Sequence, residues 1–478
     1  MRSRIILLGM VFLLPFGILH SQFDSVSLSD YKLPDIKRNQ LDIQLNSRFN
    51  HSNQMPDKYL YMNGSGTFSM AYNSYTNRRN YQGDQTVSGS LNPYFYEYKQ
   101  GASHTRSSSL QTGLNFSSVN RIYLQDLFFA EANLYAFAGK YNNSRDVRFY
   151  DAADSLTQRN KSDERTLNLH VRVPLLLGYG RIEPVEDARL AVYILEDMEK
   201  LGRLTRTPTR EEIMELASLI STVKNERVLD SRIKKIGELK SIDAFLQQKG
   251  LITQADGTYF TSLNDNWDYS AGPVRYSGFR IYGGIEPSFV PIFNNTTNLN
   301  RDESLDTLYS DETESYDREL QINGLLGFRY NKPLSLSWQF ACGADFYYVW
   351  GNMLNEDRLN DYETRTRLAG LQPRQYIQAG YYPDSRTYTT WRLSMNESRI
   401  KDYSWDETDE EWIEQGLDSD ISLDFSWQFY YYISPRLRLS GTYRLFLSRG
   451  KYASDIINDS HDSMFSNDLS LGVNYSIF

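Results

Sequence analysis

Long stretches of this chain alternate between apolar and polar residues, one position at a time. In the segment 320–330 the apolar face carries Leu320, Ile322 and Leu326, with mostly polar residues between them. The same alternation runs through 167–179, 334–350 and 421–433. Successive side chains of a β-strand point to opposite faces, so this period of two predicts strands with one apolar and one polar face.

A membrane-spanning β-barrel and a soluble β-sandwich both alternate in this way. Two features favour the barrel. The alternating segments are longer than the ~5–6 residues usual in soluble sheets, and they suit a tilted membrane crossing. Trp338 and Trp350 also share a face. Their separation along a tilted strand is roughly 30 Å, near the spacing of the two aromatic girdles of membrane barrels.

Counting strands back from the C-terminus predicts an antiparallel transmembrane barrel of about fourteen strands, an even number as in single-chain bacterial barrels. The predicted strands are 38–50, 59–74, 84–98, 106–118, 122–141, 165–182, 274–292, 318–330, 334–350, 365–381, 386–395, 420–433, 436–448 and 464–478. Short joints such as 331–333 then fall on the periplasmic side, where turns are short. Long joints are predicted outside, at 293–317, 351–364, 396–419 and 449–463.

Two of the predicted outer loops are strongly acidic. The segment 293–317 carries seven acids against one base, and 396–419 carries nine acids against two bases. Such runs are typical of solvated surface loops. Oxygen-rich clusters also suit divalent cations that bridge to lipopolysaccharide, although no fixed ligand spacing is present.

One segment changes its period. From Glu183 to Gly250 apolar residues recur every three or four positions, which predicts three amphipathic helices. Pro184 suits a first helical position, Gly202 ends the first helix, and Thr209 begins the second with a capping box. Residues 251–273 are predicted as a linker that returns to the barrel.

The composition of this segment is that of a small soluble unit, with 13 acids, 12 bases and only two aromatic residues. In the strand count the segment falls in the periplasm. A unit of this size is marginally stable alone. We therefore expect it to dock beneath the barrel mouth or to bind a periplasmic partner within Glu183 to Gly250; an insert with no separate task is the alternative.

The N-terminus predicts a secretory signal peptide over residues 1–21. Arg2 and Arg4 precede an apolar core, and Ser21 is a small residue suited to the position before cleavage. A signal anchor is the other interpretation. Residues 22–37 are predicted either to lie in the periplasm or to enter the lumen as a plug. The single cysteine, Cys342, excludes an intramolecular disulfide framework.

The chain ends in "DLSLGVNYSIF", where Leu469, Leu471, Val473 and Tyr475 alternate before the terminal Phe478. This resembles the closing strand of bacterial, porin-like outer-membrane β-barrel proteins, although here the apolar series is one place out of phase with the last residue. The resemblance implies a Gram-negative outer membrane, contact with its lipid and lipopolysaccharide, and recognition by the barrel-insertion machinery through the strand that ends in Phe478.

If the apolar rows face lipid, the polar rows face the lumen. The alternation turns a set of charged residues inward, together with Asp42: Arg48, Glu131, His170, Arg172, Arg280, Glu286, Arg329, Asp345, Asp424, Arg438 and Arg444. These residues suit a charged constriction that orients a solute. They also suit a salt-bridged plug, in which each charge offsets the desolvation of another.

The sequence contains none of the local motifs of hydrolases, zinc proteases or phosphate-binding loops. We therefore predict no catalytic residue, metal or cofactor, and the net charge of −9 argues against a nucleic-acid partner. The prediction is a channel or transporter for a small hydrophilic solute. The alternatives are a non-conducting scaffold whose helical insert binds a periplasmic or envelope-assembly partner, and surface adhesion through the acidic loops.

Overall fold

A computed structural model describes most of the chain. The described residues are 23, 26–54, 59–125, 127–151, 153, 155–225, 231–269, 274–302, 307–406, 410–434, 437–452 and 460–475. The predicted signal peptide, the start of the predicted third helix and Phe478 lie outside these residues.

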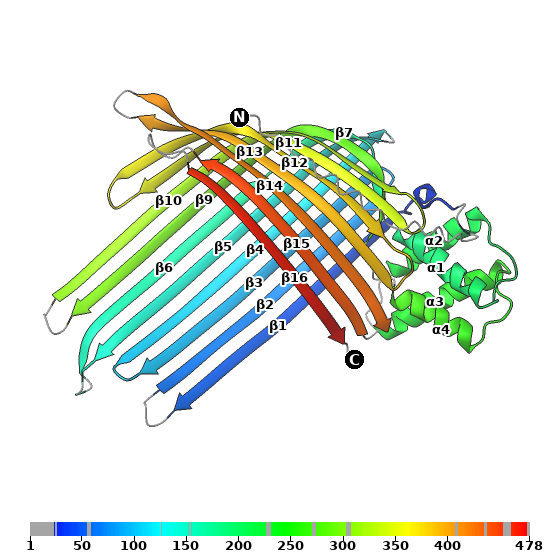
Figure 1. The fold of residues 1–478 in the computed structure, drawn as a ribbon, viewed down its shortest axis with the longest axis horizontal. Coiled ribbons are helices and arrows are strands. Elements are labelled where there is room, and N and C mark those ends of the chain that lie inside the picture. The colour runs from blue at the N-terminus through cyan, green and yellow to red at the C-terminus, as the bar shows by residue number, and fades with distance from the viewer. Residues whose placement is uncertain are drawn as a thin grey trace.

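One antiparallel sheet coils into a barrel, with neighbours in chain order from β1 to β6 and from β9 to β16 (Figure 1). This path holds fourteen strands, as predicted, and the short β7 (Leu175–Tyr179) and β8 (Ile182–Pro184) lie off it. The path strands are β1 (Ile36–Gln54), β2 (Tyr59–Arg78), β3 (Tyr81–Gln100), β4 (Ser103–Gln125), β5 (Phe128–Tyr150), β6 (Leu156–Arg172), β9 (Tyr276–Asp302), β10 (Thr307–Pro333), β11 (Trp338–Asp357), β12 (Tyr362–Tyr381), β13 (Thr387–Asp406), β14 (Glu411–Ser434), β15 (Leu437–Tyr452) and β16 (Ser460–Tyr475). Within the described residues, no ladder joins β1 to β16.

The prediction of long outer loops is wrong, because the strands continue through most of the residues that were assigned to those loops. β9 and β10 stay paired as far as Asp302 and Thr307, and β13 and β14 as far as Asp406 and Glu411. A ladder needs only backbone N–H and C=O groups, so two strands can remain paired after both faces have become polar. Alternation therefore marked the membrane-facing part of each strand and not its end.

On β9 and β10 the exposed apolar row occupies only part of the strand. On β10 it runs from Leu320 to Tyr330, with Leu308 exposed separately near the other end, and on the neighbouring β9 it runs from Phe293 to Phe279. Both stretches lie towards the rim that carries the helices, which we call the helical rim; the opposite end is the far rim (Figure 1). No helix among the described residues is long and apolar enough to cross a membrane.

The predicted strand 165–182 is broken in the structure. β6 ends at Arg172, β7 covers Leu175–Tyr179 and β8 covers Ile182–Pro184. β6 and β7 pair with the same two neighbours, β5 and β9. Pro174 stands at the break, since it has no N–H to donate to a ladder. β6 and β7 therefore occupy a single strand position in the wall, interrupted at Pro174.

Four helices follow β8 among the described residues: α1 (Glu186–Lys200), α2 (Arg210–Lys224), α3 (Ser231–Gln248) and α4 (Gly257–Asp268). The predicted capping box of Thr209 and Glu212 is confirmed. Pro184, predicted at the start of a helix, instead ends β8. The next residue, Val185, still donates its backbone N–H to the carbonyl of Arg275 at 2.8 Å, which holds the chain on the wall for one more position.

The predicted linker 251–273 is also wrong, because it contains α4. The Asp256 side chain caps this helix by accepting from the N–H of Tyr259 at 3.0 Å. Tyr259, Leu263 and Trp267 are buried on one stripe. The prediction missed the helix because residues 257–268 are rich in Gly, Thr, Asn and Asp, which have low helix propensity.

Candidate functional site

The polar rows of the wall face the lumen, since they alternate with the exposed apolar rows. Six of the charged residues predicted to line the lumen form ion pairs between neighbouring strands. The pairs are Arg172 with Glu286 (3.7 Å), Arg329 with Asp345 (3.0 Å) and Arg444 with Asp424 (2.7 Å). The structure therefore brings these predicted residues together two by two across β6–β9, β10–β11 and β14–β15.

The other predicted lumen residues have different surroundings. Glu131 accepts from Arg121 at 2.7 Å, and His170 lies 3.2 Å from the hydroxyl of Ser288. The Nε atom of Arg280 is buried without a hydrogen-bond partner among the described residues. Arg48 on β1 and Arg438 on β15 are exposed, and the Arg438 guanidinium lies 5.3 Å from the centre of the Tyr430 ring.

Arg121 was missed because its position was predicted to lie in a turn, 119–121, between two strands. In the structure β4 continues to Gln125, and Arg121 is one of its inward residues.

A pocket of about 490 Å³ lies on the inner face of β10 to β14. It is lined by Arg329, Asp345, Arg374, Gln375, Tyr376, Arg392, Ser394, Asn396 and Asp424. We call this the arginine pocket. It contains the Arg329–Asp345 pair, and through Asp424 it reaches the pair with Arg444.

Strand register explains why these side chains meet. Arg374 on β12 is the register partner of Asp345 on β11 and of Asn396 on β13. Ser394 on β13 is in turn the partner of Asp424 on β14. Residues opposite one another in a ladder share a face, so the pocket is a row that crosses five strands at one level of the lumen.

Two glycines make room for this row. A Cβ atom at Gly343 would lie 2.7 Å from Cδ of Arg329 and 2.8 Å from the Tyr376 ring. A Cβ at Gly327 would lie 2.5 Å from the carboxylate of Asp345. Only glycine therefore lets the Arg329 and Tyr376 side chains lie close against the wall.

Arg374 and Arg392 differ from the other arginines of the row. Within the described residues neither forms an ion pair with a carboxylate, and both side chains are exposed to the lumen. The Arg374 guanidinium lies 5.0 Å from the Tyr347 ring centre. Arg392 lies 4.2 Å from the Tyr376 ring centre, and its Nε donates to the Ser394 hydroxyl at 3.2 Å.

The net charge of the pocket is therefore positive, because its two carboxylates are already matched by Arg329 and Arg444. Sequence reasoning missed Arg374 and Arg392, which lie on the two strands with the weakest alternation. A signal was present, since both positions alternate with the outward Leu371, Ile377 and Leu393.

The second candidate region is the helical unit, defined as α1–α4 with an N-terminal segment of residues 23 and 26–35. Its core is formed by buried residues, among them Leu195, Leu216 and Ile220 with 0–1% exposure. Phe23 and Tyr31 of the N-terminal segment belong to the same core. The apolar side chains of this segment therefore pack on the helices, while the sequence had left open a position in the periplasm or in the lumen.

Arginines fasten the helical unit to the helical rim. Arg275, which is 3% exposed, donates to the backbone carbonyls of Ser335, Leu336 and Trp338 at 2.5–3.0 Å. Burial lowers its pKa to about 10. Because these carbonyls belong to the β10–β11 turn, Arg275 ties the return of the chain from the helices to a different part of the wall.

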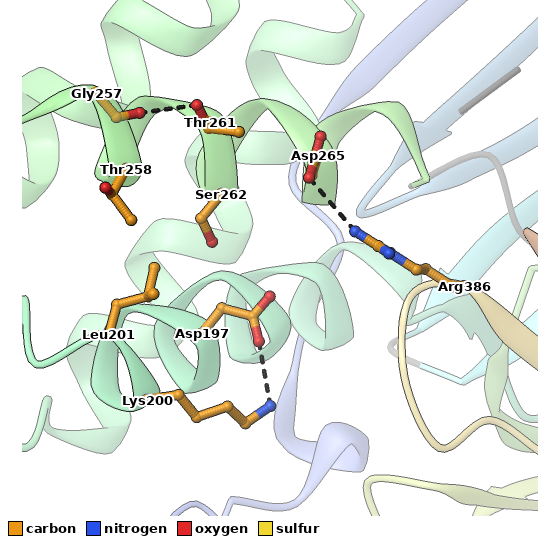
Figure 2. Close-up of a pocket in the computed structure, with 9 residues that line it drawn as sticks. All are labelled: Asp197, Lys200, Leu201, Gly257, Thr258, Thr261, Ser262, Asp265 and Arg386. Atoms are coloured by element: carbon orange, nitrogen blue, oxygen red, sulfur yellow. Dashed lines mark hydrogen bonds and ion pairs between the residues drawn. The ribbon is translucent and has the colours of Figure 1, made fainter. Parts of the chain in front are cut away.

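A groove of about 630 Å³ lies where the helical unit meets the β12–β13 turn (Figure 2). Asp197 and Lys200 of α1 form one side and pair at 3.1 Å, while α4 forms the other. Asp265 of α4 reaches across to Arg386 of the turn at 3.4 Å. The groove is open, and beside this ion pair the Arg386 guanidinium lies 4.6 Å from the centre of the ring of Tyr269, the residue that follows α4.

A partly buried acidic group lies at the start of α1. Burial, and after it the neighbouring charge of Asp187, raises the pKa of Glu186 to about 7. Asp187 is matched by Lys224 at 2.7 Å and accepts from Ser221. The Oε2 atom of Glu186 has no hydrogen-bond partner among the described residues. Glu186 is therefore a titratable group inside the helical unit near neutral pH.

An exposed apolar belt outside and polar rows inside define the architecture of an outer-membrane β-barrel, here with a helical insert. No protein-family model and no curated protein sequence matches the chain. Within the described residues, no three His, Cys, Asp or Glu side chains are grouped so that they could hold a metal ion.

Three solved structures show a low similarity to the chain. The translocator domain of the autotransporter NalP from Neisseria meningitidis has 9% identity and a TM-score of 0.24, and the match covers 79% of this chain and 85% of that one. The CymD monoaromatic hydrocarbon channel has 9% identity and a TM-score of 0.28, and the match covers 96% of this chain and 93% of that one. The TodX deltaS2S3 mutant monoaromatic hydrocarbon channel has 8% identity and a TM-score of 0.21, and the match covers 94% of this chain and 92% of that one. Similarity this low leaves the function to be inferred from the residues of this chain.

Proposed function

We propose that this protein is an outer-membrane channel or transporter that passes a small hydrophilic solute through the lumen of its barrel. The arginine pocket carries the proposal. Arg374 and Arg392 present exposed cationic groups on the inner wall, where they can replace part of the hydration shell of a passing solute. The exposed apolar rows outside support insertion into lipid, since every strand between the two edges has its backbone paired.

We place the helical unit in the periplasm and the far rim outside the cell. Support comes from the closing strand, since β16 ends at Tyr475 beside Leu437, at the helical rim. In the outer-membrane barrels whose closing strand this chain resembles, that strand ends in the periplasm. The polar, acidic hairpin ends at the far rim would then meet lipopolysaccharide, with divalent cations between the two anionic surfaces.

Conductance in planar bilayers tests this function. The full chain is compared with a variant in which residues 186–274 are replaced by a short Gly-Ser turn, because Val185 and Arg275 are already hydrogen-bonded at 2.8 Å. We expect both proteins to conduct, since the lumen pocket belongs to the wall. Heat-modifiable gel migration serves as the control for a folded barrel. A folded full chain that carries no current would contradict the proposal.

The second candidate function is a non-conducting scaffold whose helical unit binds a periplasmic partner. It is favoured by two observations: the unit has a packed core, and it presents an open groove at the rim. A scaffold predicts no current from either protein, and a cellular defect that the 186–274 deletion reproduces although its barrel still folds.

A further inference from the structure

The arginine pocket contains more positive charge than a structural role requires. A salt-bridged plug needs each arginine to be matched by a carboxylate, as Arg329 is by Asp345 and Arg444 is by Asp424. Arg374 and Arg392 have no such partner among the described residues. Two unmatched positive charges in one pocket favour an anion bound between them.

The aromatic contacts of these arginines suit recognition of an anion. Tyr376 lies 5.6 Å from the Arg329 guanidinium and 4.2 Å from that of Arg392, so one ring contacts two arginines of the pocket. Tyr347 contacts Arg374 in the same way. A guanidinium held against a ring loses little further entropy on binding, and its N–H edge can bind two oxygens at once.

Beside Arg392, β13 also supplies neutral hydrogen-bonding groups to the pocket. Ser394 and Asn396 on β13 line it together with the charged residues. Their hydroxyl and amide groups can donate to an oxygen that the guanidiniums leave unpaired. A volume of about 490 Å³ accommodates a small organic acid or a phosphate with its water.

We propose that the arginine pocket is the binding and selectivity site for solutes that carry an oxyanion group, a carboxylate or a phosphate, with Arg374 and Arg392 as the binding residues. The inference rests on the proposed channel function and specifies its substrate class. It makes the channel anion-selective, with binding at the pocket slowing the passage of oxyanions relative to chloride.

The test compares the full chain with Arg374→Gln/Arg392→Gln in planar bilayers. Reversal potentials in a KCl gradient give the ion preference, and added succinate or inorganic phosphate gives the block of the chloride current. We expect the unmodified chain to prefer chloride over potassium and to be blocked by at least one of the two probes. The double variant should lose the preference and bind the blocking probe about ten-fold more weakly or worse.

Two further variants control the result. Arg399→Gln removes an arginine from β13 on the opposite face, since Arg399 is the register partner of the outward Leu371, and should change neither readout. Arg374→Lys/Arg392→Lys keeps both positive charges but removes the guanidinium groups, which can bind an oxyanion in a bidentate manner. It should keep the chloride preference but weaken the block. A double Gln variant that folds and keeps both properties would overturn the inference, as would an unmodified chain blocked by neither probe.

The pocket can also be tested if the channel proposal fails. If the folded full chain carries no current, titration calorimetry with succinate and phosphate measures binding to the same proteins in detergent. Binding that the Arg374→Gln/Arg392→Gln variant loses would support the oxyanion site without a channel. Absence of binding to the unmodified chain would overturn the site itself.

Discussion

The barrel wall and the helical unit use the same apolar residue types in opposite ways. In the wall, Leu320 and Ile285 are 44% and 50% exposed on the outer face, while charged residues fill the inner one. In the helical unit, Leu216 and Ile220 are fully buried, and most charged side chains are at least partly exposed, with Asp187 and Arg189 as buried exceptions. The difference shows that each region is folded against a different solvent: the wall against lipid and the unit against water.

The two regions also differ in what holds them together. Each wall strand depends on continuous ladders with its neighbours, so polar residues can extend it beyond the apolar belt. The helical unit depends on a small packed core, in which the substitution of a single buried residue can unfold the unit. The unit should therefore be the more easily damaged of the two, and damage to it should leave the wall intact.

The largest expected effect is in the core of the helical unit. Ile220→Asp places a charge where no exposed surface exists, which should cost at least about 4 kcal/mol and unfold the unit. Limited proteolysis should then cleave α1–α4 while heat-modifiable migration shows an intact barrel. Glu211→Asp on the exposed face of the same helix is the matched control. A barrel that fails together with the unit would show that the two fold as one.

The next effect divides the wall itself. Ile285→Arg lies in the middle of the outward apolar row of β9 and should destabilise the barrel by about 2–4 kcal/mol if that row faces lipid. Leu308→Arg lies near the far rim, opposite Arg301, and should cost at most about 1 kcal/mol because water surrounds it. Urea unfolding in vesicles measures both. Equal costs would remove the distinction between a lipid-facing belt and polar hairpin ends.

The smallest effect concerns pH and separates the unit from the wall. The Glu186 carboxyl has a pKa of about 7 in the folded unit, above its usual value, so the folded state holds the proton more tightly than the unfolded chain. The stabilisation is complete below a pH of about 4.5 and is lost as pH rises past 7, by at most roughly 3 kcal/mol. Asp187 opposes ionisation of Glu186, whereas Lys224 and Arg38 favour it.

Hydrogen exchange of α1 at pH 5 and pH 8 measures this change. Opening should be more frequent at pH 8 in the unmodified chain and independent of pH in Glu186→Gln. The exchange of a wall strand such as β4 serves as the internal reference, after correction for the intrinsic pH dependence of amide exchange. If the Gln variant keeps the full difference, another group is responsible.

Much of the fold followed from local pattern. Period-two alternation located all fourteen path strands, and period-three-and-four spacing located α1 and α2 with the capping box at Thr209. The pattern failed where local chemistry and position disagreed. It treated the polar hairpin ends as loops, read Asn120 and Arg121 as a turn, and overlooked α4, whose residues have low helix propensity but are held by burial of Tyr259 and Trp267.

Less of the site could be predicted. Alternation assigns Arg329, Asp345 and Asp424 to the inner face, because the face of a residue depends only on its parity within a strand. It cannot pair them, because pairing depends on the register between strands that are far apart in sequence. Arg172 and Glu286, for example, are separated by the whole helical unit and still lie 3.7 Å apart.

The sequence by itself therefore determined which residues face lipid, which face the lumen, and where the chain leaves the sheet to form helices. These properties are local, since they depend on periods of two and of about 3.6 residues. Only the tertiary structure decided that Arg374 and Arg392 stand beside two neutralised pairs, and that the N-terminal segment packs on the helices. Both depend on which strands and helices become neighbours, and no local period encodes that.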